Sequence, residues 1–164
     1  MSGVPAIFLD RDGVLVRERG EHTWRLEDFV ILPTVVEALR AICAAGKRSI
    51  MVTNQSGIGL GLYGHGDVEL LHAYLHTHLA EHGAAIDAVY YCPHHPQQGR
   101  CLCRKPGSLL LERAIARFGI DAEASAMIGD RDRDVEAANG AGVRGILVEP
   151  NAPLLDVLKN HALI

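Results

Sequence analysis

Short apolar runs rich in aliphatic and β-branched residues alternate along the chain with longer segments of helical periodicity. The apolar runs predict five strands, over residues 6–9, 48–53, 88–91, 126–128 and 145–148. The periodic segments predict helices over residues 33–45, 67–82, 108–119 and 133–139, with a short final helix over 153–159. Strands that alternate with helices are typical of βα units around a parallel sheet. We therefore predict a three-layer α/β fold with a five-stranded, mainly parallel sheet.

Polar residues interrupt this pattern at the ends of the predicted strands. Asp10, Thr53, Cys92 and Asp130 each lie at or just past the carboxyl end of a different strand. In open α/β sheets ligands bind at this edge. The sequence therefore predicts one functional site to which four separate strand ends contribute.

Composition narrows the possible classes of protein. With 164 residues, 48% of them hydrophobic, we expect a single domain over residues 1–164. A net charge of -4 and an aromatic content of 5% disfavour nucleic-acid binding. No segment approaches the roughly 18 consecutive apolar residues that indicate a membrane span. The first residues carry no basic segment before a short apolar run, so we expect a cytoplasmic protein without a membrane contact. We also expect a monomer, because a small domain can work alone.

The first strand is followed by two carboxylates at Asp10 and Asp12. On extended backbone, residues two apart point to the same side, so Arg11 between them is expected to point away. Two anions in one small space are stabilised by a cation or a proton. Mg²⁺ beside this pair would suit phosphoryl transfer, in which one carboxylate attacks phosphorus and the other protonates the leaving oxygen. A bare pair of this kind also occurs in solvated turns.

Three further segments favour the catalytic interpretation. Residues 53–57 (TNQSG) offer a hydroxyl, two amides and backbone N–H groups for phosphate oxygens. Arg104 and Lys105 supply cations ahead of the third helix. Asp130, after the fourth strand, provides another carboxylate for the oxygen shell of Mg²⁺.

Three cysteines and a histidine form two short clips in the segment between the third strand and the third helix: Cys92, His94, Cys101 and Cys103. Tetrahedral Zn²⁺ takes such a set, and four protein ligands leave no open position for catalysis. We therefore predict a structural zinc site, with His95 as the rival ligand to His94. A chance cluster of thiols is the alternative. Cys43, in an apolar helical pattern, is expected to be a buried, inert thiol.

Two other clusters carry no chemistry in this interpretation. The segment 72–82 contains several histidines at helical spacing, and their apolar neighbours already form a helical stripe. We expect these histidines to form a solvated or half-buried helix face. The glycines of residues 57–66 lack the spacing of a P-loop and indicate a loop on the substrate side.

Four motifs carry a resemblance to a known family. DRDG, TNQSG, CRKP and GDxxxD, in this order over residues 6–148, resemble the motifs of the haloacid dehalogenase (HAD) phosphatase superfamily. More narrowly, FLDRDGV, TNQSGIG, YYCPHHP and CLCRKP are similar to its zinc-bearing branch, which contains heptose 1,7-bisphosphate 7-phosphatases and histidinol-phosphate phosphatases. The resemblance implies a Rossmann-like, HAD-like fold with no separate cap domain and one zinc-stapled loop.

The resemblance also implies roles for individual residues. Asp10 would be the nucleophile and Asp12 the general acid and base, while Thr53 and Lys105 would stabilise the phosphoryl group. Magnesium would be held by Asp10, the backbone carbonyl of Asp12, and Asp130, and zinc by Cys92, His94, Cys101 and Cys103. The substrate would contact Gly20, Asn54, Gln55, Ser56, Arg104 and Arg131.

The function implied is the magnesium-dependent hydrolysis of a small phosphorylated metabolite. A heptose 1,7-bisphosphate that loses its 7-phosphate is the first choice, which would place the enzyme in carbohydrate metabolism and lipopolysaccharide precursor biosynthesis. Histidinol phosphate is the alternative substrate. A non-catalytic, zinc-stapled binding module is disfavoured because Asp10, Asp12, Lys105 and Asp130 are all present. Zinc-based nucleic-acid binding is disfavoured because no basic helix follows the clips.

Overall fold

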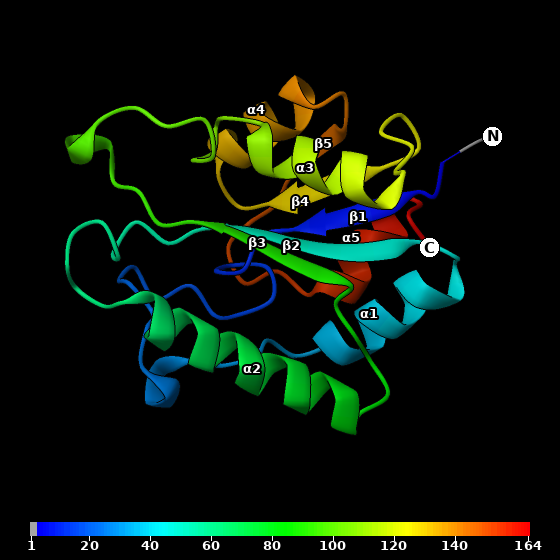
Figure 1. The fold of residues 1–164 in the computed structure, drawn as a ribbon. Coiled ribbons are helices and arrows are strands. Elements are labelled where there is room, and N and C mark those ends of the chain that lie inside the picture. Colours follow the sequence, from blue (N-terminus) through cyan, green and yellow to red (C-terminus); the bar gives the residue numbers. More distant parts are fainter. Residues whose placement is uncertain (1–2) are drawn as a thin grey trace.

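The computed structural model describes residues 3–164 and contains a five-stranded parallel sheet (Figure 1). The strands are β1 (Ala6–Leu9), β2 (Arg48–Asn54), β3 (Ala88–Cys92), β4 (Ala126–Gly129) and β5 (Arg144–Leu147). Their order across the sheet is β3-β2-β1-β4-β5. The five expected strands are confirmed, each to within one residue at either end. Because β1 lies in the centre, the loop that follows it opens between the ends of β2 and β4.

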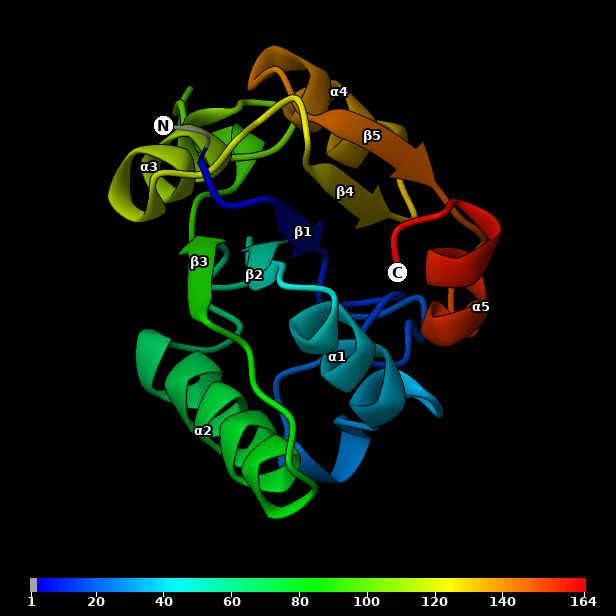
Figure 2. The ribbon, with the colours of Figure 1, turned by 90° about the vertical axis from the view of Figure 1, so that its right-hand side faces the viewer.

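Helices cover both faces of the sheet, which gives the three predicted layers (Figures 1 and 2). They are α1 (Val35–Ala44), α2 (His65–Glu81), α3 (Leu109–Phe118), α4 (Asp132–Gly140) and α5 (Leu154–Asn160), with 3-10 turns at Leu26–Asp28 and Pro96–Gln98. α2 begins two residues before the expected start. Asp67 is not its N-cap but the third helical residue, and its carboxylate accepts the N–H of Gly64.

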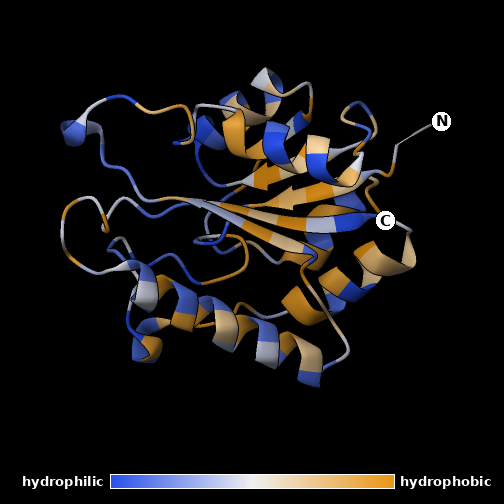
Figure 3. Ribbon diagram, viewed as in Figure 1, coloured by the Kyte–Doolittle hydropathy of each residue, from blue (hydrophilic) through white to orange (hydrophobic). Residues whose placement is uncertain are grey.

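Successive side chains of the strands enter two different hydrophobic cores. Ile7 and Leu9 of β1 pack with α1, α2 and α5, whereas Ala6 and Phe8 pack with α3 and α4. Strands buried on both faces read as continuous apolar runs, and Figure 3 shows the sheet as the most hydrophobic layer. No separate cap domain interrupts the fold within residues 3–164.

The exposure of Cys43 differs from the sequence prediction. Its side chain is exposed, whereas Leu39 and Ile42 of the same helix are buried in the core. Neighbouring positions on a helix are rotated by about 100°, so the buried stripe of α1 leaves Cys43 on the solvent side. The expectation of a buried thiol was therefore wrong.

In the part of the chain that the structure describes, no helix is both long enough and apolar enough to cross a membrane.

Candidate active site

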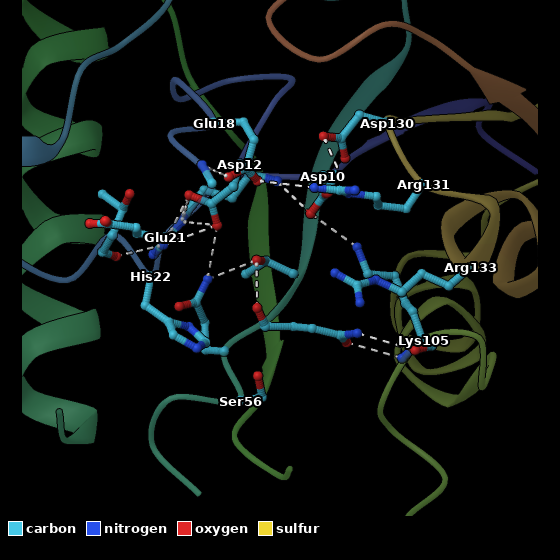
Figure 4. Close-up of a pocket in the computed structure, with 16 residues that line it drawn as sticks. Asp10, Asp12, Glu18, Glu21, His22, Ser56, Lys105, Asp130, Arg131 and Arg133 are labelled. Atoms are coloured by element: carbon cyan, nitrogen blue, oxygen red, sulfur yellow. Dashed lines mark hydrogen bonds and ion pairs between the residues drawn. The ribbon is translucent and has the colours of Figure 1, made fainter. Parts of the chain in front are cut away.

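The carboxyl ends of the central strands open into a cavity of about 230 Å³ (Figure 4). Most of the candidate site residues line it: Asp10, Asp12, Gly20, Thr53, Asn54, Gln55, Ser56, Lys105, Asp130 and Arg131. Arg104 is a candidate that does not line this cavity. Six further residues line it that the sequence did not single out: Arg11, Glu18, Glu21, His22, Thr23 and Arg133.

A tight turn after β1 brings the backbone against the opposite wall of the cavity. Gly13 has a φ of 91°, in the left-handed region that favours glycine. A Cβ at this position would collide with the carboxylate of Asp130. The glycine of the DRDG motif therefore allows the β1 loop and the end of β4 to lie in direct contact.

Three carboxylates gather at this contact. Asp10, Asp130 and Asp134 offer oxygens that lie within 4.8 Å of one another, and all three residues are buried. Burial raises the pKa of Asp130 to about 7, and the negative charges of Asp10 and Asp134 act in the same direction. Oδ2 of Asp130 is buried without a hydrogen-bond partner among the described residues. Three buried carboxylates, with one oxygen of Asp130 that has no hydrogen-bond partner within residues 3–164, fit Mg²⁺, which prefers oxygen ligands.

Lys105 is the cation of this cluster. Its Nζ lies 3.0 Å from Oδ1 of Asp10 and 2.7 Å from Oδ1 of Asp134, and it donates a hydrogen bond to the carbonyl of Val52. Burial opposes the charged form of Lys105, but the two carboxylates outweigh burial and raise its pKa. Asp134, the last residue of the GDxxxD pattern, therefore belongs to the site, although the pattern alone did not assign it a role.

The carboxylate of Asp12 lies outside this cluster, contrary to expectation. Arg11 does not point away from it but turns back, so that its Nε lies 3.2 Å from Oδ1 and 3.1 Å from Oδ2 of Asp12. Nη2 of Arg11 also lies 3.1 Å from each oxygen. The guanidinium thus neutralises Asp12, which explains why the two motif carboxylates do not share one space.

The segment after β2 connects the site to neighbouring loops. Nε2 of Gln55 donates to Oγ1 of Thr53 at 2.9 Å and approaches Oδ2 of Asp12 at 3.4 Å. The side-chain amide of Asn54 holds the backbone of Lys105: its Nδ2 donates to the carbonyl of Lys105 at 3.1 Å, and its Oδ1 accepts the N–H of Lys105 at 3.0 Å. Asn54 therefore positions the lysine, and Gln55 connects Thr53 to Asp12.

One histidine of α2 takes part in the same network. His72 is buried, with 6% of its surface exposed, and its Nε2 lies 3.4 Å from Nη1 of Arg11. Burial lowers the pKa of His72 to about 3, and the charge of Arg11 lowers it further. The expectation of a solvated or half-buried face was wrong at this position, because Arg11 turns towards α2.

The expected metal clips come together in space. Cys92, His94, Cys101 and Cys103 offer ligand atoms within 4.8 Å of one another, and Nδ1 of His94 lies 3.3 Å from Sγ of Cys92. His95 instead accepts the N–H of Gln97 and caps a 3-10 turn. Four converging sulfur and nitrogen ligands fit tetrahedral Zn²⁺.

The environment of these thiols varies across the cluster. Burial raises the pKa of Cys92. Burial alone would also raise that of Cys101, but the N–H of Arg104 and the neighbouring thiols outweigh it and lower the pKa to about 7. Cys101 is therefore easier to deprotonate than Cys92, and the thiolate is the form that binds zinc.

Two arginines lie on one side of the cavity, and a third, Arg104, lies near one of them without lining it. Arg131 and Arg133 line it, opposite Glu21 and His22 in the view of Figure 4. Burial and the nearby positive charge of Arg133 lower the pKa of Arg104, whose Nη1 is buried without a hydrogen-bond partner among the described residues. Like charges held together are stabilised when an anion binds between them.

Comparisons with known proteins agree with this geometry. A family model described as HAD-hydrolase-like matches residues 102–153. A D-glycero-beta-D-manno-heptose-1,7-bisphosphate 7-phosphatase of Escherichia coli (strain K12) is 37% identical over 166 residues, covering 97% of this chain and 86% of the relative. A D-glycero-alpha-D-manno-heptose-1,7-bisphosphate 7-phosphatase of Burkholderia mallei is 40% identical over 144 residues, covering 84% of this chain and 76% of the relative.

A solved structure gives the same result at the level of the fold. The D,D-heptose 1,7-bisphosphate phosphatase from B. bronchiseptica, complexed with magnesium and phosphate, superposes with a TM-score of 0.84 at 30% identity. The alignment covers 96% of this chain and 87% of that one. The similarity therefore extends over nearly the whole chain.

Proposed function

The chain belongs to the family of heptose 1,7-bisphosphate 7-phosphatases, which are HAD-like hydrolases, and we propose that it hydrolyses the 7-phosphate of D-glycero-D-manno-heptose 1,7-bisphosphate through an aspartyl phosphate on Asp10. One observation carries this proposal. Asp10, at the end of the central strand, lies in a buried cluster with Lys105, Asp130 and Asp134 at the floor of the cavity. Such a cluster supplies both a nucleophile and the charges that hold a phosphoryl group.

Magnesium would be held by Asp10, Asp130 and the backbone carbonyl of Asp12. The buried oxygen of Asp130 that lacks a partner supports this assignment. When bound, Mg²⁺ would neutralise the carboxylates and polarise the phosphoryl oxygens. Asp134, which is paired with Lys105, would keep that lysine in place beside Asp10.

The chemistry then proceeds in two in-line steps. An oxygen of Asp10 attacks phosphorus while the bond from phosphorus to the sugar oxygen breaks, and Asp12 in its protonated form donates its proton to that departing oxygen and becomes a carboxylate. A water molecule, deprotonated by Asp12, next attacks the phosphorus of the aspartyl phosphate. Phosphate leaves, and the carboxylate of Asp10 is restored. Throughout, Thr53 and Lys105 would stabilise the charge on the phosphoryl oxygens.

Orientation of Asp10 supports its role as the nucleophile. Its Oδ1 accepts two hydrogen bonds, one from Nζ of Lys105 at 3.0 Å and one from the backbone N–H of Arg11 at 2.8 Å. These donors fix the plane of the carboxylate before substrate arrives. A nucleophile held in place loses little entropy on reaching the reactive geometry.

The thiol cluster would hold zinc for a structural purpose. Its last ligand, Cys103, lies two residues before Lys105 in the chain. A metal that fixes the segment from Cys92 to Cys103 would also fix the start of the segment that delivers the lysine to the cavity. Gln98 of this segment donates to the carbonyl of Gly59, which ties it to the loop after β2.

The second phosphate of the substrate requires cations at a distance from Asp10. Arg131 and Arg133 line the cavity, and Arg104 lies close enough to Arg133 for their charges to interact. Guanidinium groups bind phosphate through paired hydrogen bonds. We assign the distal phosphate to this group of arginines.

The test compares kcat/KM for the two anomers of the heptose bisphosphate with kcat/KM for L-histidinol phosphate, on one preparation with Mg²⁺. We expect at least one anomer to exceed histidinol phosphate by more than about tenfold, roughly 1.4 kcal/mol of transition-state binding. A preference of the same size for histidinol phosphate would overturn the choice of substrate.

A further inference from the structure

We propose that His72 of α2 is a positioning residue that orients Asp12 by holding the guanidinium of Arg11. The inference deepens the proposed function, because it rests on the role of Asp12 in proton transfer. His72 lies outside the cavity and acts on Asp12, the proton-transfer group, through Arg11.

The guanidinium of Arg11 is fixed on every side. The residue is 1% exposed, its Nη2 donates to the carbonyl of Thr23 at 2.9 Å, and the group lies over the ring of Phe29 at 5.6 Å. Nη1, which makes no bond to Asp12, lies 3.4 Å from Nε2 of His72. His72 thus brings α2 into contact with this group.

The other two nitrogens of the guanidinium determine where Asp12 lies. Nε and Nη2 together contact both oxygens of the carboxylate, at 3.1 to 3.2 Å. A guanidinium is planar and rigid, so a rotation of the group would move the carboxylate with it. Whatever holds Nη1 therefore also holds the orientation of Asp12.

His72 is itself held firmly enough to serve as this anchor. It lies in the middle of α2 on its buried side, and its ring packs edge-on against Tyr91, with centroids 6.0 Å apart. Beside the permanently charged Arg11, the imidazole is neutral, and its Nε2 can accept a hydrogen bond. His72 thus links the helix layer to the acid and base of the reaction.

The orientation of Asp12 affects the rate of phosphorylation more for some substrates than for others. A sugar oxygen needs a proton as it leaves, whereas a nitrophenolate leaves without one. Misplacing a catalytic group by about 1 Å can cost 10²-fold in rate, but only for a step that uses the group. Loss of the His72 contact should therefore slow the formation of the aspartyl phosphate from the sugar substrate far more than from p-nitrophenyl phosphate.

The experiment uses full-length His72→Phe, which keeps an aromatic ring but no acceptor, and His72→Gln, whose side-chain carbonyl can accept from Arg11. His76→Phe, on an exposed position one turn further along α2, is the control. Rapid-quench kinetics give the rate of the phosphorylation step for the heptose bisphosphate and for p-nitrophenyl phosphate. We expect His72→Phe to lose about tenfold or more with the sugar and less than about threefold with the aryl phosphate. His72→Gln should retain most of the activity with both.

A double-variant cycle shows whether the effect passes through Asp12. In an Asp12→Asn background, His72→Phe should cause no further loss, because the group it positions no longer transfers a proton. An equal loss with both substrates, no loss with either, or a further loss in the Asp12→Asn background would overturn the inference.

Two controls keep this result separate from other failures. Arg11→Lys retains the charge but not the planar fork. It should therefore slow phosphorylation by the sugar substrate more than by the aryl phosphate, as His72→Phe does. This variant replaces His72→Phe in the test if His72→Phe does not fold. If the unmodified protein hydrolyses neither substrate, the proposed function fails. If it hydrolyses both and His72→Phe behaves like His76→Phe, only the role of His72 fails.

Discussion

Nζ of Lys105 lies 3.0 Å from Oδ1 of Asp10, although the two residues are 95 positions apart in the chain. The ammonium group is almost fully buried and also lies 2.7 Å from Asp134. Desolvation makes each of these charges costly alone, and only their mutual pairing stabilises them. The floor of the cavity is therefore a coupled unit in which lysine and carboxylates depend on one another.

Replacing this lysine should affect both stability and turnover. Lys105→Met leaves two buried carboxylates without their cation, so we expect the free energy of unfolding of the metal-free protein to fall by about 3–5 kcal/mol. The substitution also removes the positive charge that would stabilise the phosphoryl group, so kcat should fall by about 10²–10³-fold. Denaturant unfolding and steady-state kinetics measure the two effects. Lys159→Met, at an exposed position, should leave both unchanged.

Removal of zinc should loosen the segment that delivers Lys105. Cys103→Ser removes one of the four converging ligands, so zinc content should fall from about one ion per chain and the melting temperature should drop with it. Cys43→Ser changes an exposed thiol far from the cluster and should keep zinc and stability. The measurement is the zinc content of freshly purified, reduced protein. An unmodified chain that contained no zinc would contradict the assignment.

The buried, neutral His72 should make stability depend on pH. Its pKa of about 3 in the folded protein is depressed from the ordinary value of 6.5, so the unfolded chain binds more protons between these values. Stability contributed by the neutral ring is complete above pH 6.5 and is lost as the pH falls towards 3. Relative to His72→Phe, the unmodified protein should lose up to about 1.4 kcal/mol per pH unit in this range.

Denaturant unfolding of both proteins at pH 7, 5.5 and 4.5 checks this expectation. The exposed His76→Phe variant should follow the unmodified protein at each pH. If the stabilities of His72→Phe and of the unmodified protein changed in parallel, the ring would not be held neutral by burial.

The arginines of the cavity should distinguish a bisphosphate from a monophosphate. Arg133→Ala removes a cation assigned to the distal phosphate, and we expect KM for the heptose 1,7-bisphosphate to rise by about tenfold. KM for a heptose that carries only the 7-phosphate should change little. Arg113→Ala, on α3, is the control outside the cavity. An equal rise in KM for both substrates would contradict the assignment of Arg133 to the distal phosphate.

The sequence predicted the fold and the position of the site because both depend on regular features. Buried parallel strands read as short apolar runs, and polar residues after Leu9, Val52 and Ile128 mark their carboxyl ends. The resemblance to the zinc-bearing branch favoured His94 over the rival His95, and the structure places His94 in the thiol cluster. Regular patterns thus predicted the elements and the grouping of these ligands.

What the sequence did not predict is the direction in which individual side chains turn once the chain is folded. Alternation along extended backbone placed Arg11 away from Asp12, but the chain turns after β1, and the arginine pairs with the adjacent carboxylate. His72 lies on the buried side of α2, where its ring contacts that arginine and Tyr91. Arg133 faces the cavity from the first turn of α4, a direction that composition alone does not indicate.

The most direct test of the account is to find where the phosphoryl group resides during turnover. The protein is mixed with the heptose bisphosphate and Mg²⁺, quenched in acid within the first turnover, digested and analysed by mass spectrometry. We predict that the peptide containing Asp10 gains the mass of one phosphoryl group, and that Asp10→Asn abolishes both this gain and turnover while the protein remains folded. Phosphorylation of another residue, or sustained turnover by Asp10→Asn, would contradict the account.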